Sequence, residues 1–295
     1  MTETDYGIKP EGYRLPEQAH IGAVILRVSD IERSLAFYRD FLGFSEIARE
    51  ASEIKLGVDG RPLVVLRSGA HGPLRERRLG LYHFAILLPD RAALGRALEH
   101  LVSSGLQPGA SDHLVSEALY ISDPDGLGIE IYRDRPRAEW KATARQLNMA
   151  TDPLDFDAVI AAGDGQAWQG MPAGTVIGHV HLHVGDIEAA KAFYHNAVGL
   201  DVMVWSYPGA LFLSAGGYHH HLGTNTWAGP RATAPSSDEP QLLAWQLVLP
   251  APTDVAAAAA NITAKGFAAT PEEPGGSLAA DPWGTALQLV AAAGT

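Results

Sequence analysis

The chain has 295 residues, no cysteine and a formal net charge of −12. The lack of cysteine excludes disulfides, zinc–thiolate sites and thiol nucleophiles, and it fits a reducing compartment. The negative charge argues against nucleic-acid binding, because that affinity rests on Lys and Arg. The sequence has no apolar run of membrane-spanning length and no apolar segment typical of a signal peptide. We therefore expect a soluble, cytoplasmic protein that binds neither nucleic acid nor membrane.

The first predicted unit is a strand followed by a helix, and it occurs twice. Many residues of this unit recur at a constant offset of 156 positions, among them Ile21, Gly22, Val28, Asp30, Tyr38 and Gly43. Alternating apolar residues over 24–28 predict a half-buried strand, and Asp30 can cap a helix that Gly43 ends. Strands over 53–58 and 62–67 follow, joined by a tight turn.

A second kind of unit fills the other two quarters. It has a strand, a helix rich in Ala or Leu that ends at a glycine, and a hairpin around an Asp-Pro-x-Gly turn. In the first half these elements span 81–88, 91–104 and 120–132; in the second half the strand and helix span 243–249 and 253–265, with the turn at 281–284. We interpret Asp123, Asp125 and Gly126 as turn residues, since the other oxygen ligands of a calcium loop are absent.

The element order is therefore βαβββ, four times. We predict an N-terminal pair of modules over 1–140, a connection over 141–175 and a C-terminal pair over 176–295. The proline-rich connection is expected to hold a helix near 138–147.

Four βαβββ modules with these turns resemble the vicinal oxygen chelate superfamily, which includes glyoxalases, fosfomycin-modifying enzymes and type I extradiol dioxygenases. The resemblance implies an α+β fold, in which paired modules form two domains of curled mixed sheets with helices outside. It also implies that side chains from the first and last strands of paired modules converge on one divalent metal. The fold alone does not choose a reaction.

Residues 112–130 are similar to the extradiol dioxygenase signature. That signature has a His, a Tyr preceded by an apolar residue, an acidic-Pro-x-Gly turn and a Glu ten residues after the Tyr. These elements correspond here to His113, Tyr120, the 123–126 turn and Glu130. The Gly-Gly-Tyr-His-His-His segment at 216–221 further resembles bacterial catechol 2,3-dioxygenases. The resemblance implies an enzyme of aromatic catabolism that opens a catechol or substituted catechol with O2.

The superfamily takes one metal ligand from the first strand of each paired module and a carboxylate from the last strand of one. The corresponding positions in the four modules hold Ala23, His83, His179 and Ala244 on first strands, with Glu130 and Gln288 on last strands. One full set is implied, His83, Glu130 and His179, and it requires module two to pair with module three. Such a triad suits Fe(II), with Mn(II) as the alternative.

Other interpretations of these ligand residues remain open. His83 lies in an apolar strand and could be a core histidine. A buried Glu130 needs a cation or hydrogen bonds, because its neighbours in the strand pack on the opposite face. His179, His181 and His183 share one face of their strand, so any of them could bind a metal, and the repeat offset selects His179.

The resemblance gives His113 and Tyr120 roles beside the metal, in which Tyr120 hydrogen-bonds an oxygen of the substrate and His113 lies nearby. It also implies an acid–base histidine within 219–221, because imidazole titrates near neutral pH. A surface histidine tract that binds adventitious metal is the alternative.

Alternation along the predicted last strand of the third module suggests which side chains of this region face the substrate. If Leu222 faces the core, then His219 and His221 face the cup and His220 does not. The same alternation would make Asn225 and Trp227 line the substrate pocket.

Three functions compete on this scaffold. The first is the extradiol dioxygenase, with a catechol-type molecule and O2 as its partners. The second is a glyoxalase-like lyase or isomerase, whose fourth ligand would come from 219–221. The third is a non-catalytic protein that binds an aromatic ligand. An unpaired sheet edge or an apolar patch would allow a homo-oligomer, and the sequence leaves that open.

Overall fold

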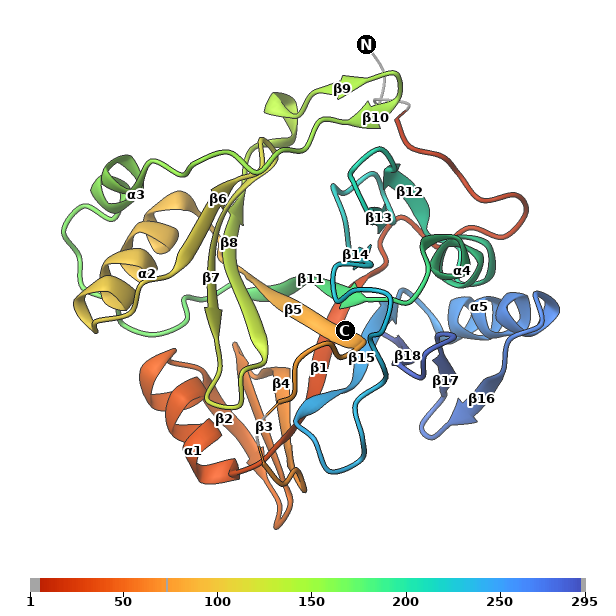
Figure 1. The fold of residues 1–295 in the computed structure, drawn as a ribbon, viewed down its shortest axis with the longest axis horizontal. Helices are drawn as coiled ribbons and strands as arrows, with labels where there is room; N and C mark the ends of the chain where they lie inside the picture. Colours follow the sequence, from red (N-terminus) through yellow and green to blue (C-terminus); the bar gives the residue numbers. More distant parts are fainter. Residues whose placement is uncertain (1–5, 73, 293–295) are drawn as a thin grey trace.

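The computed structural model describes residues 6–72 and 74–292. These residues form two eight-stranded mixed sheets, with the longer helices outside them (Figure 1). The four βαβββ modules are present in the predicted order. No helix of the described ranges is long and apolar enough to cross a membrane.

The first half contains modules one and two. Module one comprises β1 (His20–Val28), α1 (Ile31–Leu35) continued by a π-helical segment (Ala36–Phe41), β2 (Ser45–Arg49), β3 (Glu53–Val58) and β4 (Arg61–Ser68). Module two comprises β5 (Gly80–Leu87), α2 (Arg91–Ser103), β6 (Gly109–Asp112), β7 (Ser116–Ser122) and β8 (Gly128–Asp134). The connection holds a 3-10 turn (Arg137–Glu139), β9 (Ala142–Thr143), β10 (Gln146–Leu147) and α3 (Phe156–Ala162).

The second half repeats this order. Module three comprises β11 (Val176–His183), α4 (Ile187–Lys191) continued by a π-helical segment (Ala192–Ala197), β12 (Asp201–Val204), β13 (Ala210–Ser214) and β14 (Leu222–Asn225). Module four comprises β15 (Gln241–Leu249), α5 (Pro252–Ala264), β16 (Ala269–Glu272), β17 (Gly276–Ala280) and β18 (Ala286–Ala291).

The modules pair across the halves of the chain. One sheet joins modules one and four through antiparallel β1 and β15, and the other joins modules two and three through antiparallel β5 and β11. The predicted pairing of module two with module three is therefore confirmed. Each sheet takes strands from both sides of the connection, and the division at 1–140 and 176–295 remains our proposal for how the chain is organised.

An equivalent Tyr–Asp hydrogen bond joins the two modules within each half of the chain. The Tyr38 hydroxyl donates to the Asp123 carboxylate at 3.0 Å, and Tyr194 donates to Asp281 at the same distance. Asp123 also accepts from two backbone amides of its own turn, at Asp125 and Leu127. The interpretation of 123–126 as a turn is confirmed, because the Asp123 carboxylate is used inside the protein.

The repeated Gly43 is required by backbone geometry. Its φ of +85° lies in the left-handed region. A Cβ at this position would lie 2.2 Å from the Cα of Gly170, in the connection. The chain can therefore turn at Gly43, just after the π-helical segment, and still pack closely against the connection.

The helix predicted near 138–147 is wrong. Residues Ala142–Leu147 form the β9–β10 hairpin, whose turn residues Ala144 and Arg145 have φ of +49° and +68°. The Gln146 side chain accepts from the backbone amides of Trp205 and Ser206, so contacts with module three fix this segment. The helix of the connection is α3, which begins after the Asp155 cap.

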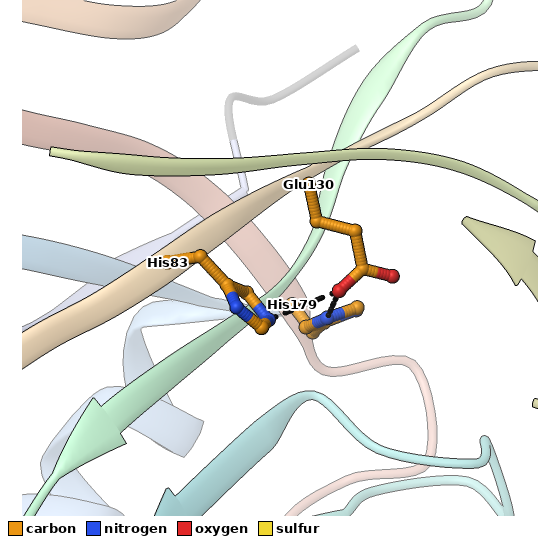
Figure 2. A group of neighbouring side chains, drawn as sticks. All are labelled: His83, Glu130 and His179. Carbon is orange, nitrogen blue, oxygen red and sulfur yellow. Dashed lines mark hydrogen bonds and ion pairs between the residues drawn. The ribbon is translucent and has the colours of Figure 1, made fainter. Parts of the chain in front are cut away.

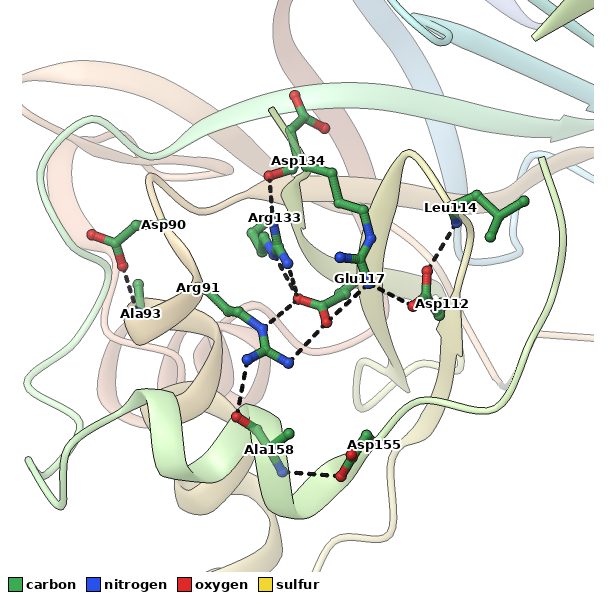
Figure 3. Close-up of polar contacts among 11 residues, drawn as sticks. Asp90, Arg91, Ala93, Asp112, Leu114, Glu117, Arg133, Asp134, Asp155 and Ala158 are labelled. Atoms are coloured by element: carbon green, nitrogen blue, oxygen red, sulfur yellow. Dashed lines mark hydrogen bonds and ion pairs between the residues drawn. The ribbon is translucent and has the colours of Figure 1, made fainter. Parts of the chain in front are cut away.

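A buried carboxylate joins module two to the connection. Glu117 on β7 is 3% exposed and contacts the guanidinium groups of Arg91, Arg133 and Arg135 (Figure 3). Arg91 also donates to the Ala158 carbonyl of α3 at 3.1 Å. Burial raises the pKa of Glu117, but hydrogen bonds from Arg91 and Arg133 outweigh it and lower this pKa below its usual range.

Replacing Glu117 with glutamine is expected to lower the free energy of unfolding by about 3 kcal/mol at pH 7, because the buried Arg133 guanidinium loses its counter-charge. The folded-state pKa is depressed, so this stabilisation is present above the ordinary Glu pKa of 4.5 and is lost as the pH falls through the folded value. Urea denaturation of wild type and variant at pH 7 and at pH 3 measures it. Replacement of the exposed Glu50 is the control; an equal, pH-independent loss in both variants would contradict the assignment.

Candidate metal centre and its cavity

Three buried side chains converge at the seam between modules two and three. They are His83 on β5, Glu130 on β8 and His179 on β11, with one ligand atom of each within 4.8 Å of the others. The Nε2 atoms of His83 and His179 lie 3.0 Å and 3.2 Å from the same carboxylate oxygen, Oε2 of Glu130 (Figure 2). The strand order β11–β5–β8 brings these residues together from distant parts of the sequence.

The protonation states of this group suit a cation. Burial raises the pKa of Glu130, but the charges and hydrogen bonds of His179 and His83 hold this pKa well below its usual range. Burial lowers the pKa of His179 to about 4, despite the opposing charge of Glu130. At neutral pH Glu130 is therefore ionised and His179 is neutral, which is the state that metal ligands need.

Hydrogen bonding leaves part of the group unsatisfied. His83 Nε2 and His179 Nδ1 are buried and have no hydrogen-bond partner among the described residues, although His83 Nε2 lies close to Glu130. An ionised carboxylate that is 2% exposed needs compensation. A divalent metal would take the imidazole lone pair and balance the carboxylate charge, so the donor set fits such an ion.

The other sheet has no equivalent group. At the corresponding positions it carries Ala23, Ala244 and Gln288. Ala23 and Ala244 belong to a small apolar cluster, and Gln288 accepts from the Gln246 side chain at 3.2 Å. Among the described residues the protein therefore has one candidate metal centre, in the sheet shared by the two inner modules.

A cavity of about 450 Å³ opens onto the metal centre. His83, Glu130, His113 and Tyr120 line it. The Tyr120 hydroxyl lies 2.6 Å from His113 Nε2, and His113 Nδ1 lies 2.6 Å from the Ala150 carbonyl. Because a carbonyl only accepts, His113 Nδ1 carries the proton, and Nε2 of the neutral ring accepts from Tyr120.

The histidine run differs from the predicted alternation. His220 lines the cavity, while His219 and His221 are buried and are not among its lining residues. His219 Nε2 lies 2.9 Å from Asp134, and its Nδ1 lies 2.7 Å from Nδ1 of His220. The expectation that His219 and His221 face the cup was wrong because the run precedes β14 and lies outside the regular strand.

The Asp134 carboxylate determines the tautomers of His219 and His220. Asp134 can only accept, so His219 carries its proton on Nε2 and its Nδ1 accepts from His220. His220 Nε2 is thus left without a proton. Burial, followed by the charges of His179 and His219, holds the pKa of His220 well below its usual range.

The two predicted substrate-binding residues have different positions. Trp227 lines the cavity, and its backbone amide donates to the Asn225 side chain at 2.9 Å. Asn225 is fully buried, outside the cavity lining, and also contacts His181 and His183. Sequence reasoning did not place several lining residues, which come from widely separated segments of the chain: Tyr82, Met149, Thr151, His181, Tyr207 and Phe212.

Comparison with known proteins agrees with this fold. Residues 19–131 and 176–289 match the family described as Glyoxalase/Bleomycin resistance protein/Dioxygenase superfamily. The chain belongs to this superfamily. A catechol-2,3-dioxygenase of Bacillus subtilis (strain 168) is 44% identical to it over 241 residues, which are 79% of this chain and 84% of that protein.

Solved structures of superfamily scaffolds resemble the whole chain. Glyoxalase I from Zea mays has 18% identity and a TM-score of 0.56, with 93% of this chain and 92% of that chain covered. A structure from Bacillus subtilis subsp. subtilis str. 168 has 12% identity and a TM-score of 0.68, with 95% and 86% covered. At these identities the likeness shows the fold alone.

Proposed function

We propose that the protein is an extradiol dioxygenase that opens the ring of a catechol with O2, beside the two hydroxyl groups. The observation that carries this proposal is the group of His83, Glu130 and His179 next to the Tyr120–His113 pair in one cavity. The relative named as a catechol-2,3-dioxygenase supports the same class of reaction.

Fe(II) is the metal we propose for this site, and Mn(II) is the alternative, because both accept nitrogen and oxygen ligands. His83, Glu130 and His179 would hold the ion. When bound, it would supply the redox chemistry through which O2 reacts with an aromatic diol. Three protein ligands leave positions open for small molecules.

Tyr120 and His113 are the residues we propose to assist the diol. Burial, followed by the charge of Glu130, raises the pKa of Tyr120 well above its usual range, so the phenol keeps its proton. Because Tyr120 donates to His113, its oxygen can accept a hydrogen bond from a diol hydroxyl. The hydrogen bond to the Ala150 carbonyl keeps the His113 ring in the orientation in which its Nε2 accepts the hydrogen bond from Tyr120.

Of the three histidines in the run, we propose that His220, and not His219 or His221, contacts the substrate. It faces the cavity, and its unprotonated Nε2 can accept a hydrogen bond from a bound molecule. His219 and Asp134 hold its ring in this orientation. We propose His220 as the third polar group of the site.

The glyoxalase-like alternative needs a fourth protein ligand. Among the described residues, the group of histidines and carboxylates that can share an ion has three members, and none comes from 219–221. This favours the dioxygenase.

Oxygen consumption tests the proposal. The protein is loaded with Fe(II) under anaerobic conditions and mixed with catechol in an oxygen electrode. Uptake of O2 with formation of a yellow semialdehyde is expected. A loaded protein that consumes no O2 with any diol would contradict the proposed function.

Replacing Tyr120 with phenylalanine is expected to lower kcat with catechol about 100-fold, since a positioned acid–base group typically contributes that much. The metal content should stay at the wild-type level, because Tyr120 is not a ligand. Replacement of Tyr38 by phenylalanine is the control, since it also removes a tyrosine hydroxyl with a side-chain hydrogen-bond partner, but outside the cavity. Unchanged turnover in the Tyr120 variant would contradict the role proposed for this residue.

A further inference from the structure

The cavity is larger than a bare catechol needs. Its volume of about 450 Å³ is within the range of pockets that enclose drug-sized ligands. The diol must lie at the end where Glu130, His113 and Tyr120 meet. The rest of the lining includes Met149, from the connection, and Phe212 on β13.

Aromatic rings form much of the cavity lining. Tyr82 and Trp227 are perpendicular at 5.7 Å, Trp227 and Tyr207 are 6.2 Å apart, and Tyr207 and Phe212 are perpendicular at 5.8 Å. We call Tyr82, Phe212, Tyr207 and Trp227 the aromatic wall. Because neighbouring rings of the wall are oriented differently, an apolar group can contact both ring faces and ring edges.

Hydrogen bonds hold the aromatic wall in place before any ligand binds. The Trp227 indole donates to the Pro208 carbonyl at 3.0 Å. The Tyr207 hydroxyl lies 2.7 Å from the Thr151 hydroxyl, which links module three to the connection. A preformed wall loses little conformational entropy on binding, so it favours a rigid apolar ligand.

The charges near the cavity discriminate between types of substituent. Glu130 is the one Asp, Glu, Lys or Arg side chain among the described residues that line the cavity. A second groove is lined by Arg75, Arg77 and Arg78, and it shares Tyr82, His83, Tyr120 and Trp227 with the cavity. Arg75 and Arg78 pair with the buried Glu239 at 3.3 Å and 3.0 Å, and Glu76 also lines the groove, so two carboxylates offset two of its three positive charges.

We propose that the preferred substrate is a catechol with an uncharged, apolar substituent about the size of a phenyl ring, which packs against the aromatic wall. This inference rests on the proposed function. It names a substrate class for the site and excludes catechols whose substituent is a carboxylate.

A panel of diols tests the preference. We compare kcat/KM for catechol, 3-phenylcatechol, 4-phenylcatechol and 3,4-dihydroxybenzoate. At least one phenylcatechol is expected to exceed catechol by about 10-fold or more, as apolar groups in a fitted pocket commonly do. The carboxylate should be the poorest substrate. If catechol equals or exceeds both phenylcatechols, or if the carboxylate is best, the inference is wrong; the latter result would point to the arginine-lined groove.

Two tryptophan variants locate the effect. Trp227→Ala is expected to lower the ratio of kcat/KM for phenylcatechol over catechol about 10-fold. Trp205→Ala is the matched control, because Trp205 is similarly exposed at 38% but does not line the cavity, and it should leave the ratio unchanged. Equal ratios in wild type and Trp227→Ala would contradict the role of the wall.

Anaerobic calorimetry separates this inference from the proposed function. Phenylcatechol is expected to bind the metal-loaded wild type about 10-fold more tightly than catechol, with the gain lost in Trp227→Ala. If no diol supports O2 uptake but this binding pattern is found, the proposed function fails and the ligand preference stands. If O2 uptake occurs without the binding pattern, the preference alone fails.

Discussion

Replacing Glu130 with alanine is expected to lower the turnover of catechol below about 1% of the wild-type value. Even residues that support a metal ligand contribute 10- to 100-fold, and Glu130 is the charged member of the triad itself. The substitution also removes a carboxylate that is 2% exposed, so the metal-free fold should not be weakened by an unpaired charge.

Gln288→Ala is the matched control for Glu130→Ala. Gln288 occupies the same place on the last strand of module four, but its neighbours Ala23 and Ala244 cannot bind a metal. This variant should keep wild-type metal content and turnover. Normal turnover in Glu130→Ala, or equal losses in the two variants, would contradict the assignment of the triad.

Adding metal to the metal-free protein is expected to raise its thermal stability. An ion that binds only the folded state stabilises it by about 4 kcal/mol when free metal is roughly 1,000 times Kd. For a chain of this size that corresponds to a rise in Tm of roughly 6 °C. Anaerobic calorimetric melting after chelation and after addition of Fe(II) or Mn(II) measures the difference.

Histidine variants distinguish a specific site from metal bound elsewhere. His179→Ala should abolish the rise in Tm, whereas His20→Ala should retain it, because His20 is exposed and lies away from the triad. A rise that survives in His179→Ala would assign the metal to other residues. Because burial lowers the pKa of His179 to about 4, protonation of His179 itself should weaken metal binding only as the pH approaches that value.

Much of the fold could be predicted because local patterns and tertiary structure agree. The strand Glu53–Val58 has the predicted bounds, and helix α2, Arg91–Ser103, begins after the Asp90 cap and differs by one residue from the prediction. The repeat also made it possible to predict which modules pair. Two candidate ligand histidines on first strands, together with one carboxylate, can meet only if the second and third modules share a sheet, and the structure has this pairing.

The histidine run could not be placed by alternation because alternation applies only within a regular strand. Gly216 and Gly217 have φ of +58° and +65°, so the chain turns immediately before the histidines, and β14 begins at Leu222. A similar departure affects β5. Tyr82 and His83 are neighbours in sequence, yet both line the cavity, beside an irregularity in the β5–β11 pairing.

Alternation predicted that Trp227 lines the pocket, but the rest of the aromatic wall lay beyond sequence reasoning for a different reason. Met149 and Thr151 come from the connection, while Tyr207 follows β12, and the hydrogen bond between Thr151 and Tyr207 joins residues 56 positions apart. Such contacts arise from packing between segments and leave no periodic signal.

The most direct test of a ring-cleaving metal centre follows oxygen into the product. Wild-type protein loaded anaerobically with Fe(II) is given catechol and isotopically labelled O2, and the ring-opened product is analysed by mass spectrometry before its aldehyde exchanges with water. We expect one O2 consumed per diol, both labelled atoms in a product cleaved beside the hydroxyl groups, and no product from Glu130→Ala. Cleavage between the hydroxyl groups, unlabelled product or an equally active Glu130→Ala variant would contradict the function proposed for this site.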